Sequence, residues 1–227
     1  MAFTVTELKI ATGGRRLFQL RAMLTLAQDA DIANLVELCQ KSYNASETSI
    51  RTLAGAHFGQ FLSSSIRCAM QGGEIFVASE QGDTSGAFRG LSIWWPPGCE
   101  AFSTPEQQEI FHEFVSKLTP DEKDWHQATY RPKFGQLTNA ALGPRGKLAS
   151  YYLSLLAVEP EYQRRGIARA LISAVGSKAN GAELTLAATN ETNVRIYKQL
   201  GFVVRAETTM DGPYGAFPVF VLSSRAK

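Results

Sequence analysis

An almost unbroken apolar run at Tyr151–Val158 constrains the fold of this chain more than any other segment. A run of this length fits a strand that is covered on both faces of its sheet. A turn containing Gly166 follows, and an amphipathic pattern then predicts a helix over 166–178. Further downstream, the sequence predicts a helix at 192–200 and strands at 183–188, 202–208 and 217–222. This alternation of strands and helices predicts an α/β fold with a mixed sheet.

The first half of the chain carries weaker patterns of the same kind. Thr104, followed by Pro105 and Gln107, has the composition of a helix start. The other predicted elements are a strand at 23–27, a helix capped by Asp29 or Asp31, a helix over 51–70, and a hairpin of strands 75–79 and 88–95 joined by a turn at 81–83.

The domain organisation follows from these patterns and from the length of 227 residues, about one and a half times a typical domain. Residues 1–19, which include the turn Gly13–Arg16, are expected to be an N-terminal extension, and residues 20–227 a single domain. Residues 119–147 contain several prolines and glycines and are predicted to be irregular. We therefore expect an insert at about 100–147.

Composition excludes several classes of protein. With 44% hydrophobic and 19% charged residues, the chain is neither disordered nor collagen-like, and no apolar run approaches the ~18 residues of a membrane span. A net charge of +2 argues against a protein devoted to nucleic acid. The spacing of the three cysteines and three histidines indicates neither a disulfide framework nor a metal site. No secretory signal is evident, so the expected compartment is the cytoplasm, with or without the nucleus.

The segment from Val158 to Leu171 joins the apolar strand directly to the amphipathic helix. The first amides of a helix have no internal partner, and the helix dipole adds partial positive charge there. Gly166 lets a phosphate approach the backbone, while Gln163, Arg164 and Arg165 add donors and charge. The segment is therefore suited to bind a pyrophosphate. On spacing alone, an ordinary strand–helix turn with solvated arginines explains it equally well.

A second segment places Asn193 and Tyr197 four residues apart, on one face of the helix at 192–200. An amide beside a phenol could bind a polar chain and donate a proton. Packing of Tyr197 in the core is the more common meaning of such a pattern.

Together the two segments resemble the GNAT superfamily of acetyl-CoA-dependent N-acetyltransferases. The family's Gln/Arg-x-x-Gly-x-Gly/Ala signature is present as Gln163, Gly166 and Ala168, after a buried strand. About twenty-five residues later, Asn193 and Tyr197 precede Gly201-Phe202, as in the second family motif. The match is clear from about 148 to 209. The long insert and the segment Trp94-Trp95-Pro96-Pro97-Gly98 are loosely similar to small-molecule acetyltransferases of the puromycin-acetylating kind.

The resemblance implies a fold and a binding mode for acetyl-CoA. The fold is a central mixed, mostly antiparallel sheet flanked by helices, with splayed central strands. Backbone groups at Leu156, Ala157 and Val158 would pair with the pantetheine arm, and Asn193 would contact it as well. The pyrophosphate would be held by residues of the turn, namely Gln163, Arg164, Arg165, Gly166, Ile167 and Ala168. Tyr197 would lie near the thioester sulfur and protonate the departing thiolate, since a phenol with a pKa of about 10 is protonated at neutral pH.

The acceptor side is less defined by the sequence. Glu159, at the end of the central strand, is a candidate general base, with a solvated loop carboxylate as the alternative. Trp94 and Trp95 alternate across a strand, and one of them is expected to line the acceptor cleft unless both pack in the core. Acidic residues of the insert could attract a cationic acceptor or form a solvated face; they are Glu100, Glu106, Glu109 and Glu113.

The expected activity is transfer of the acetyl group of acetyl-CoA to a primary amine of a small molecule, by direct attack in a ternary complex. The alternatives are a protein acetyltransferase, acting on lysines or chain N-termini, and a non-catalytic acyl-CoA-binding protein. An open cleft would favour the protein substrate, whereas a pocket closed by the insert would favour the small amine. The expected partners are the amine and acetyl-CoA, with no metal, nucleic acid or membrane, in a monomer or homodimer.

Overall fold

The computed structural model describes residues 8–11, 17–23, 29–80, 85 and 87–225. Their strands form one sheet in the order β1-β2-β3-β4-β5-β6-β8-β7, in which only the β5–β6 pair is parallel. The predicted mixed, mostly antiparallel sheet is thus confirmed. The strands are β1 (Leu8–Ala11), β2 (Leu17–Met23), β3 (Glu74–Glu80), β4 (Gly90–Trp95), β5 (Tyr151–Val158), β6 (Glu183–Ala188), β7 (Val203–Met210) and β8 (Phe217–Arg225).

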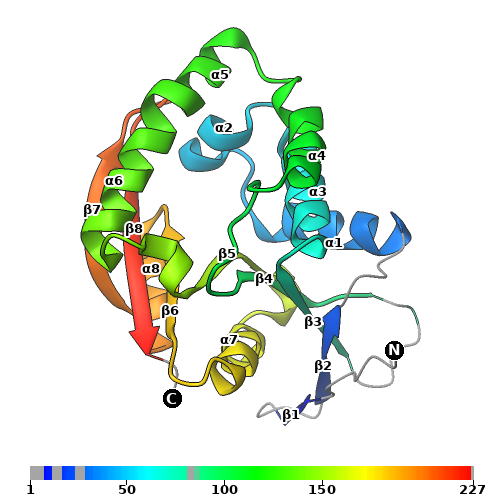
Figure 1. The fold of residues 1–227 in the computed structure, drawn as a ribbon. Helices are drawn as coiled ribbons and strands as arrows, with labels where there is room; N and C mark the ends of the chain where they lie inside the picture. Colours follow the sequence, from blue (N-terminus) through cyan, green and yellow to red (C-terminus); the bar gives the residue numbers. More distant parts are fainter. Residues whose placement is uncertain (1–7, 12–16, 24–28, 81–84, 86, 226–227) are drawn as a thin grey trace.

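Helices cover both faces of this sheet (Figure 1). On one face, α7 and α8 pack over the middle strands; on the other, α1 and α3 cover β3 and β4, while α6 lies against β7 and β8. The α-helices are α1 (Asp29–Ser42), α2 (Thr48–Ala54), α3 (Phe58–Met70), α4 (Pro105–Val115), α5 (Pro120–Trp125), α6 (Arg131–Leu142), α7 (Ile167–Lys178) and α8 (Glu191–Gln199). None of the helices that the structure describes has the length and apolar character needed to span a bilayer.

A bulge in β5 marks the place where the central strands separate. Ile93 of β4 pairs with Leu155, but the next residue, Trp94, pairs with Leu153, so Ser154 is the extra residue. The insertion moves Leu155 to the opposite face of the sheet from Leu153, and such bulges bend a strand. Beyond the bulge β5 stays paired with β4 as far as Val158, whereas its pairing with β6 ends at Leu153. The central strands are therefore splayed, as the resemblance implied.

The prediction of an irregular segment at 119–147 is wrong. The segment contains α5, a π-helix at His126–Tyr130, α6 and a 3-10 turn. Pro120 lies in the first turn of α5, where a missing N–H costs nothing because it has no helical partner there. Pro132 follows the π-helix, which continues directly into α6. Thr119 caps α5 through a capping box with Glu122, whose carboxylate accepts the Thr119 amide at 2.8 Å. Pro120 therefore starts a helix, and Pro132 lies within a continuous helical segment rather than at a break.

Other boundaries differ in detail. The helix predicted over 51–70 is two helices, α2 and α3, because Gly55 adopts a left-handed backbone with φ of +56° between them. β2 pairs with β3 and crosses the domain boundary expected at residue 20, and β1 lies within the expected extension. Of the strand predicted at 23–27, only Met23 is described, as the last residue of β2; the predicted turns Gly13–Arg16 and 81–83 lie outside the described residues.

Candidate active site

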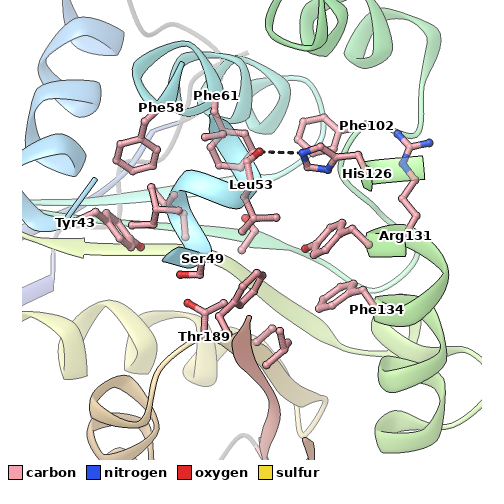
Figure 2. A pocket seen from close by; sticks show the side chains of 18 of the residues that line it. Tyr43, Ser49, Leu53, Phe58, Phe61, Phe102, His126, Arg131, Phe134 and Thr189 are labelled. Carbon is pink, nitrogen blue, oxygen red and sulfur yellow. Dashed lines mark hydrogen bonds between the residues drawn. The ribbon is translucent and has the colours of Figure 1, made fainter. Parts of the chain in front are cut away.

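The splay between β5 and β6 opens into a cavity of about 350 Å³. Its floor is formed by Leu153–Leu156 of β5 and by the end of β6 with the following Thr189. One wall comes from α2 and α3, and the opposite wall from the π-helix and α6. Figure 2 shows the side chains of these elements converging on one space around Leu53. The cavity therefore lies where β5, beyond its bulge, separates from β6.

The open edge of β5 presents backbone groups that no strand uses. The amide and the carbonyl of Leu156 both face away from β4, and the hydroxyl of Tyr43, near the C-terminal end of α1, bonds to both. It donates to the Leu156 carbonyl at 2.8 Å and accepts from the Leu156 amide at 3.4 Å. Burial raises the pKa of Tyr43 well above its ordinary value, so the phenol stays protonated. One side chain thus does for Leu156 what a neighbouring strand would do.

The helix α8 brings Asn193 and Tyr197 to the same cavity. Asn190 fixes the start of the helix, since its side-chain oxygen accepts the Asn193 amide at 2.8 Å. The Tyr197 ring packs edge-on against Phe202, with the ring centroids 5.8 Å apart. Burial raises the pKa of Tyr197 above its ordinary value. The phenol is therefore a proton donor rather than a proton acceptor at neutral pH.

The turn that enters α7 has the backbone of an anion site. Arg164 and Gly166 have φ of +59° and +83°, and Gly166 is the N-cap of α7. Alternation of left- and right-handed residues directs successive amides to one side, next to the free amides of the first helical turn. The turn is exposed, as are the side chains of Gln163 and Arg165; the Gln163 amide donates to the Val158 carbonyl at 3.2 Å.

A close contact between α7 and β4 holds this turn against the end of β5. A Cβ atom added at Gly90 would lie 2.6 Å from the Cγ2 of Ile167, so a larger residue would push the start of α7 away from the sheet. Ile167 itself is buried, whereas Ala168 is half-buried behind the turn. The turn is thus positioned by packing, outside the cavity but adjoining the strand that forms its floor.

The segment 100–147 forms much of the cavity wall: eleven of the thirty lining residues belong to it. Most of them are aromatic or basic. Tyr130 and Phe134 stack with an interplanar angle of 13° and a centroid distance of 5.4 Å, and Phe102 stacks on Phe111 at 3.9 Å. The Nε2 of His126 lies 3.0 Å from the Leu53 carbonyl, which joins the π-helix to α2 across the cavity (Figure 2). The segment therefore forms a large part of the wall of the cavity.

Two residues expected on the acceptor side lie elsewhere. Trp94 and Trp95 are 0% and 3% exposed, and both pack in the core, one on each face of the sheet. The alternation across the strand was thus correct, but β4 is covered on both faces, so neither ring reaches the cavity. The Nε1 of Trp95 donates to Ser154 Oγ at 3.2 Å, which ties β4 to the bulge.

Glu159 is engaged in an ion pair rather than directed into the cavity. Its carboxylate lies 2.7 Å from the guanidinium of Arg89 and 3.8 Å from the Lys41 ammonium. It does not line the cavity, and within the described chain no aspartate or glutamate does. The titratable cation-forming groups that line it are Lys123, His126 and Arg131. Burial lowers the pKa of His126, so its imidazole is neutral at neutral pH.

Sequence reasoning missed the residues that approach the site from distant elements. Tyr43, the side chains of α2 and the aromatic residues of α3 and the insert carry no motif; only the structure brings them beside β5. A shallow pocket shares Ser49, Thr189 and Asn193 with the cavity and contains Glu47, whose carboxylate accepts from Ser49 and Asn190 at 3.0 Å each. The described residues contain no cluster of three or more potential metal ligands.

Comparisons with known proteins agree with this geometry. Residues 103–212 match the family model described as an acetyltransferase (GNAT) domain. The match includes most of the segment expected as an insert. No curated protein matches the chain in sequence.

Several solved structures share the fold. The histone acetyltransferase HPA2 and related acetyltransferase from Corynebacterium glutamicum is 17% identical, with a TM-score of 0.57, over 91% of this chain and 96% of that one. The mosquito arylalkylamine N-acetyltransferase like 5b is 16% identical, with a TM-score of 0.58, over 90% of this chain and 99% of that one. PH1933 from Pyrococcus horikoshii OT3 is 14% identical, with a TM-score of 0.53, over 92% and 99%. At such identities the likeness concerns the fold alone.

Proposed function

We propose that this chain is a GNAT acetyltransferase, because residues 103–212 match the model of that domain, and that it transfers the acetyl group of acetyl-CoA to a primary amine of a small molecule. One observation carries the choice of a small acceptor: the segment 100–147 covers the cavity beside the open edge of β5. A peptide needs a groove that is open at both ends, whereas a cavity of about 350 Å³ is at the small end of ligand pockets.

In this proposal acetyl-CoA lies along the splay. The amides of Arg164 through Ala168, with the side chains of Gln163 and Arg165, hold the pyrophosphate at the start of α7. The pantetheine follows the open edge of β5 and takes the place of the missing strand. It pairs there with backbone groups of Leu156 and Val158, along the chain through Ala157. Asn193 contacts the same arm from α8. The fit rests on two features of the site. The turn has free amides and positive charge for an anion, and β5 has an edge, not paired with any strand, for the amides of an extended chain.

Each residue then has a simple task in the transfer. The neutral amine attacks the thioester carbonyl directly: the C–N bond forms, the C–S bond breaks, and the nitrogen gives up one proton to water. No covalent enzyme intermediate is required. Amides at the open edge of β5 donate to the carbonyl oxygen as negative charge develops on it. Tyr197, protonated because it is buried, gives its proton to the departing thiolate. Because Glu159 is paired with Arg89 outside the cavity, we do not propose it as the base.

The test is release of coenzyme A. The protein is incubated with acetyl-CoA and either a panel of small primary amines or lysine-bearing peptides, and free thiol is followed with a thiol reagent. We expect thiol release that depends on a small amine, with the acetylated amine identified by mass spectrometry. Preference for peptides would favour the protein acetyltransferase, and coenzyme binding without release for any acceptor would favour the non-catalytic alternative.

A further inference from the structure

The wall of the cavity is rich in aromatic side chains. Eleven of its thirty lining residues are phenylalanine or tyrosine. On the side of α3 and α4, Phe61 packs edge-on against Phe114 at a centroid distance of 5.3 Å, and Phe111 lies 5.4 Å from Phe114. On the side of α6, the stacked rings of Tyr130 and Phe134 face the same space. Flat rings on two sides form a slot in which another flat ring can stack or pack edge-on.

The charged side chains that line the slot are basic. The described lining residues include Lys123 and Arg131 but no carboxylate. Outside this lining, Lys147 has its Nζ 5.6 Å from the centre of the Phe134 ring and 5.1 Å from that of Tyr152, and its charge is balanced by Glu100 at 2.7 Å. The insert glutamates expected to attract a cation do not line the cavity, and Glu100 and Glu113 are paired with Lys147 and Arg67. An acceptor with several ammonium groups would therefore meet repulsion without a counter-charge.

We propose that the acceptor is a primary amine carried on a flat aromatic body, without a second positive charge. The inference rests on the proposed function and names its substrate class. The aromatic body lies between the rings of α3–α4 and α6, with the amine directed to the open edge of β5. The volume, part of which the acyl end of the coenzyme takes, leaves room for one or two fused rings. Polyamines, aminoglycosides and lysine-rich peptides satisfy neither the shape nor the charge.

The experiment compares amines of matched reach. At saturating acetyl-CoA, kcat/KM is measured for 2-phenylethylamine, tryptamine, 2-cyclohexylethylamine, spermidine and a lysine-bearing peptide. We expect the two aromatic amines to exceed spermidine and the peptide by about tenfold or more, and the cyclohexyl compound to fall between them. A preference for spermidine or the peptide would overturn the inference. Failure to bind acetyl-CoA, or to release thiol with any amine, would instead refute the proposed function.

Two pairs of variants make the test specific. Phe134→Ala should raise KM for tryptamine about tenfold and leave the acetyl-CoA dissociation constant unchanged, while Phe134→Leu should have an intermediate effect because it keeps apolar bulk. Arg131→Glu should improve kcat/KM for spermidine relative to tryptamine, and more so than the neutral control Arg131→Gln. Arg131 is exposed, so either substitution can be made without burying a charge. Unchanged selectivity in both pairs would place the acceptor elsewhere.

Discussion

The proposed coenzyme half and the proposed acceptor half of the site offer different kinds of chemical group. The coenzyme side, from β5 through α8, offers mainly backbone groups: the open edge at Leu156 and the amides entering α7. The proposed acceptor side, from α2, α3 and the segment 100–147, offers side chains, and seven of its seventeen lining residues are phenylalanine or tyrosine. Backbone groups are the same in every sequence, whereas the rings can change one at a time. Changes on the first side should therefore affect every reaction of the enzyme, and changes on the second should alter the choice of amine.

The largest effect is expected at the entrance to α7. Gly166→Glu places a carboxylate and a side chain where the phosphates are proposed to lie, on a backbone with φ of +83°. We expect acetyl-CoA affinity to fall at least about a hundredfold, by calorimetry, for a protein that still melts cooperatively. Gly166→Ala is the control: it carries only the strain of a left-handed alanine, about 1–2 kcal/mol, without the charge. Equal losses in the two variants would show that strain, and not charge, governs binding there.

Tyr197→Phe separates chemistry from binding on the coenzyme side. The variant removes one hydroxyl and keeps the ring that packs on Phe202. We expect kcat to fall by about a hundredfold, in the range for loss of a general acid, with the acetyl-CoA dissociation constant unchanged. Tyr152→Phe is the matched control, because Tyr152 also lines the cavity and its pKa is likewise raised by burial. A similar loss in both variants, or none in either, would remove Tyr197 from the acid role.

Tyr43→Phe tests whether the Tyr43 hydroxyl must leave the edge of β5 before acetyl-CoA can bind there. The Tyr43 hydroxyl occupies the two groups of Leu156 that are proposed to pair with the pantetheine. Displacing it costs the coenzyme about 1 kcal/mol, the net worth of a hydrogen bond. We therefore expect Tyr43→Phe to bind acetyl-CoA about fivefold more tightly by calorimetry. Weaker binding would mean that the hydroxyl helps to hold the coenzyme rather than competing with it.

The difference between the halves also explains how far the sequence could predict them. The boundaries of β5 were predicted to the residue, and the turn at Gly166 was recognised. Both depend on local sequence: the apolar residues of the strand, and a turn conformation that favours glycine. The same local reasoning failed for 119–147, where Pro120 starts a helix and Pro132 lies between the π-helix and α6 in continuous helical backbone. It placed a tryptophan in the acceptor cleft, whereas both tryptophans are buried. The cavity wall is formed by elements that are distant in the sequence and come together beside the bulge at Ser154. No single segment of the sequence therefore predicts it.

The smallest effect is expected at Glu159, which follows β5 but lies outside the cavity. Its side chain is 14% exposed, that of Arg89 is 21% exposed, and their charged groups are 2.7 Å apart. Glu159→Gln leaves the Arg89 charge less well compensated, so we expect the free energy of unfolding to fall by about 1 kcal/mol in denaturant titrations. Because Glu159 does not line the cavity, kcat and its dependence on pH should stay as in the wild type. A loss of kcat comparable to that of Tyr197→Phe, with an altered pH profile, would instead make this carboxylate the base.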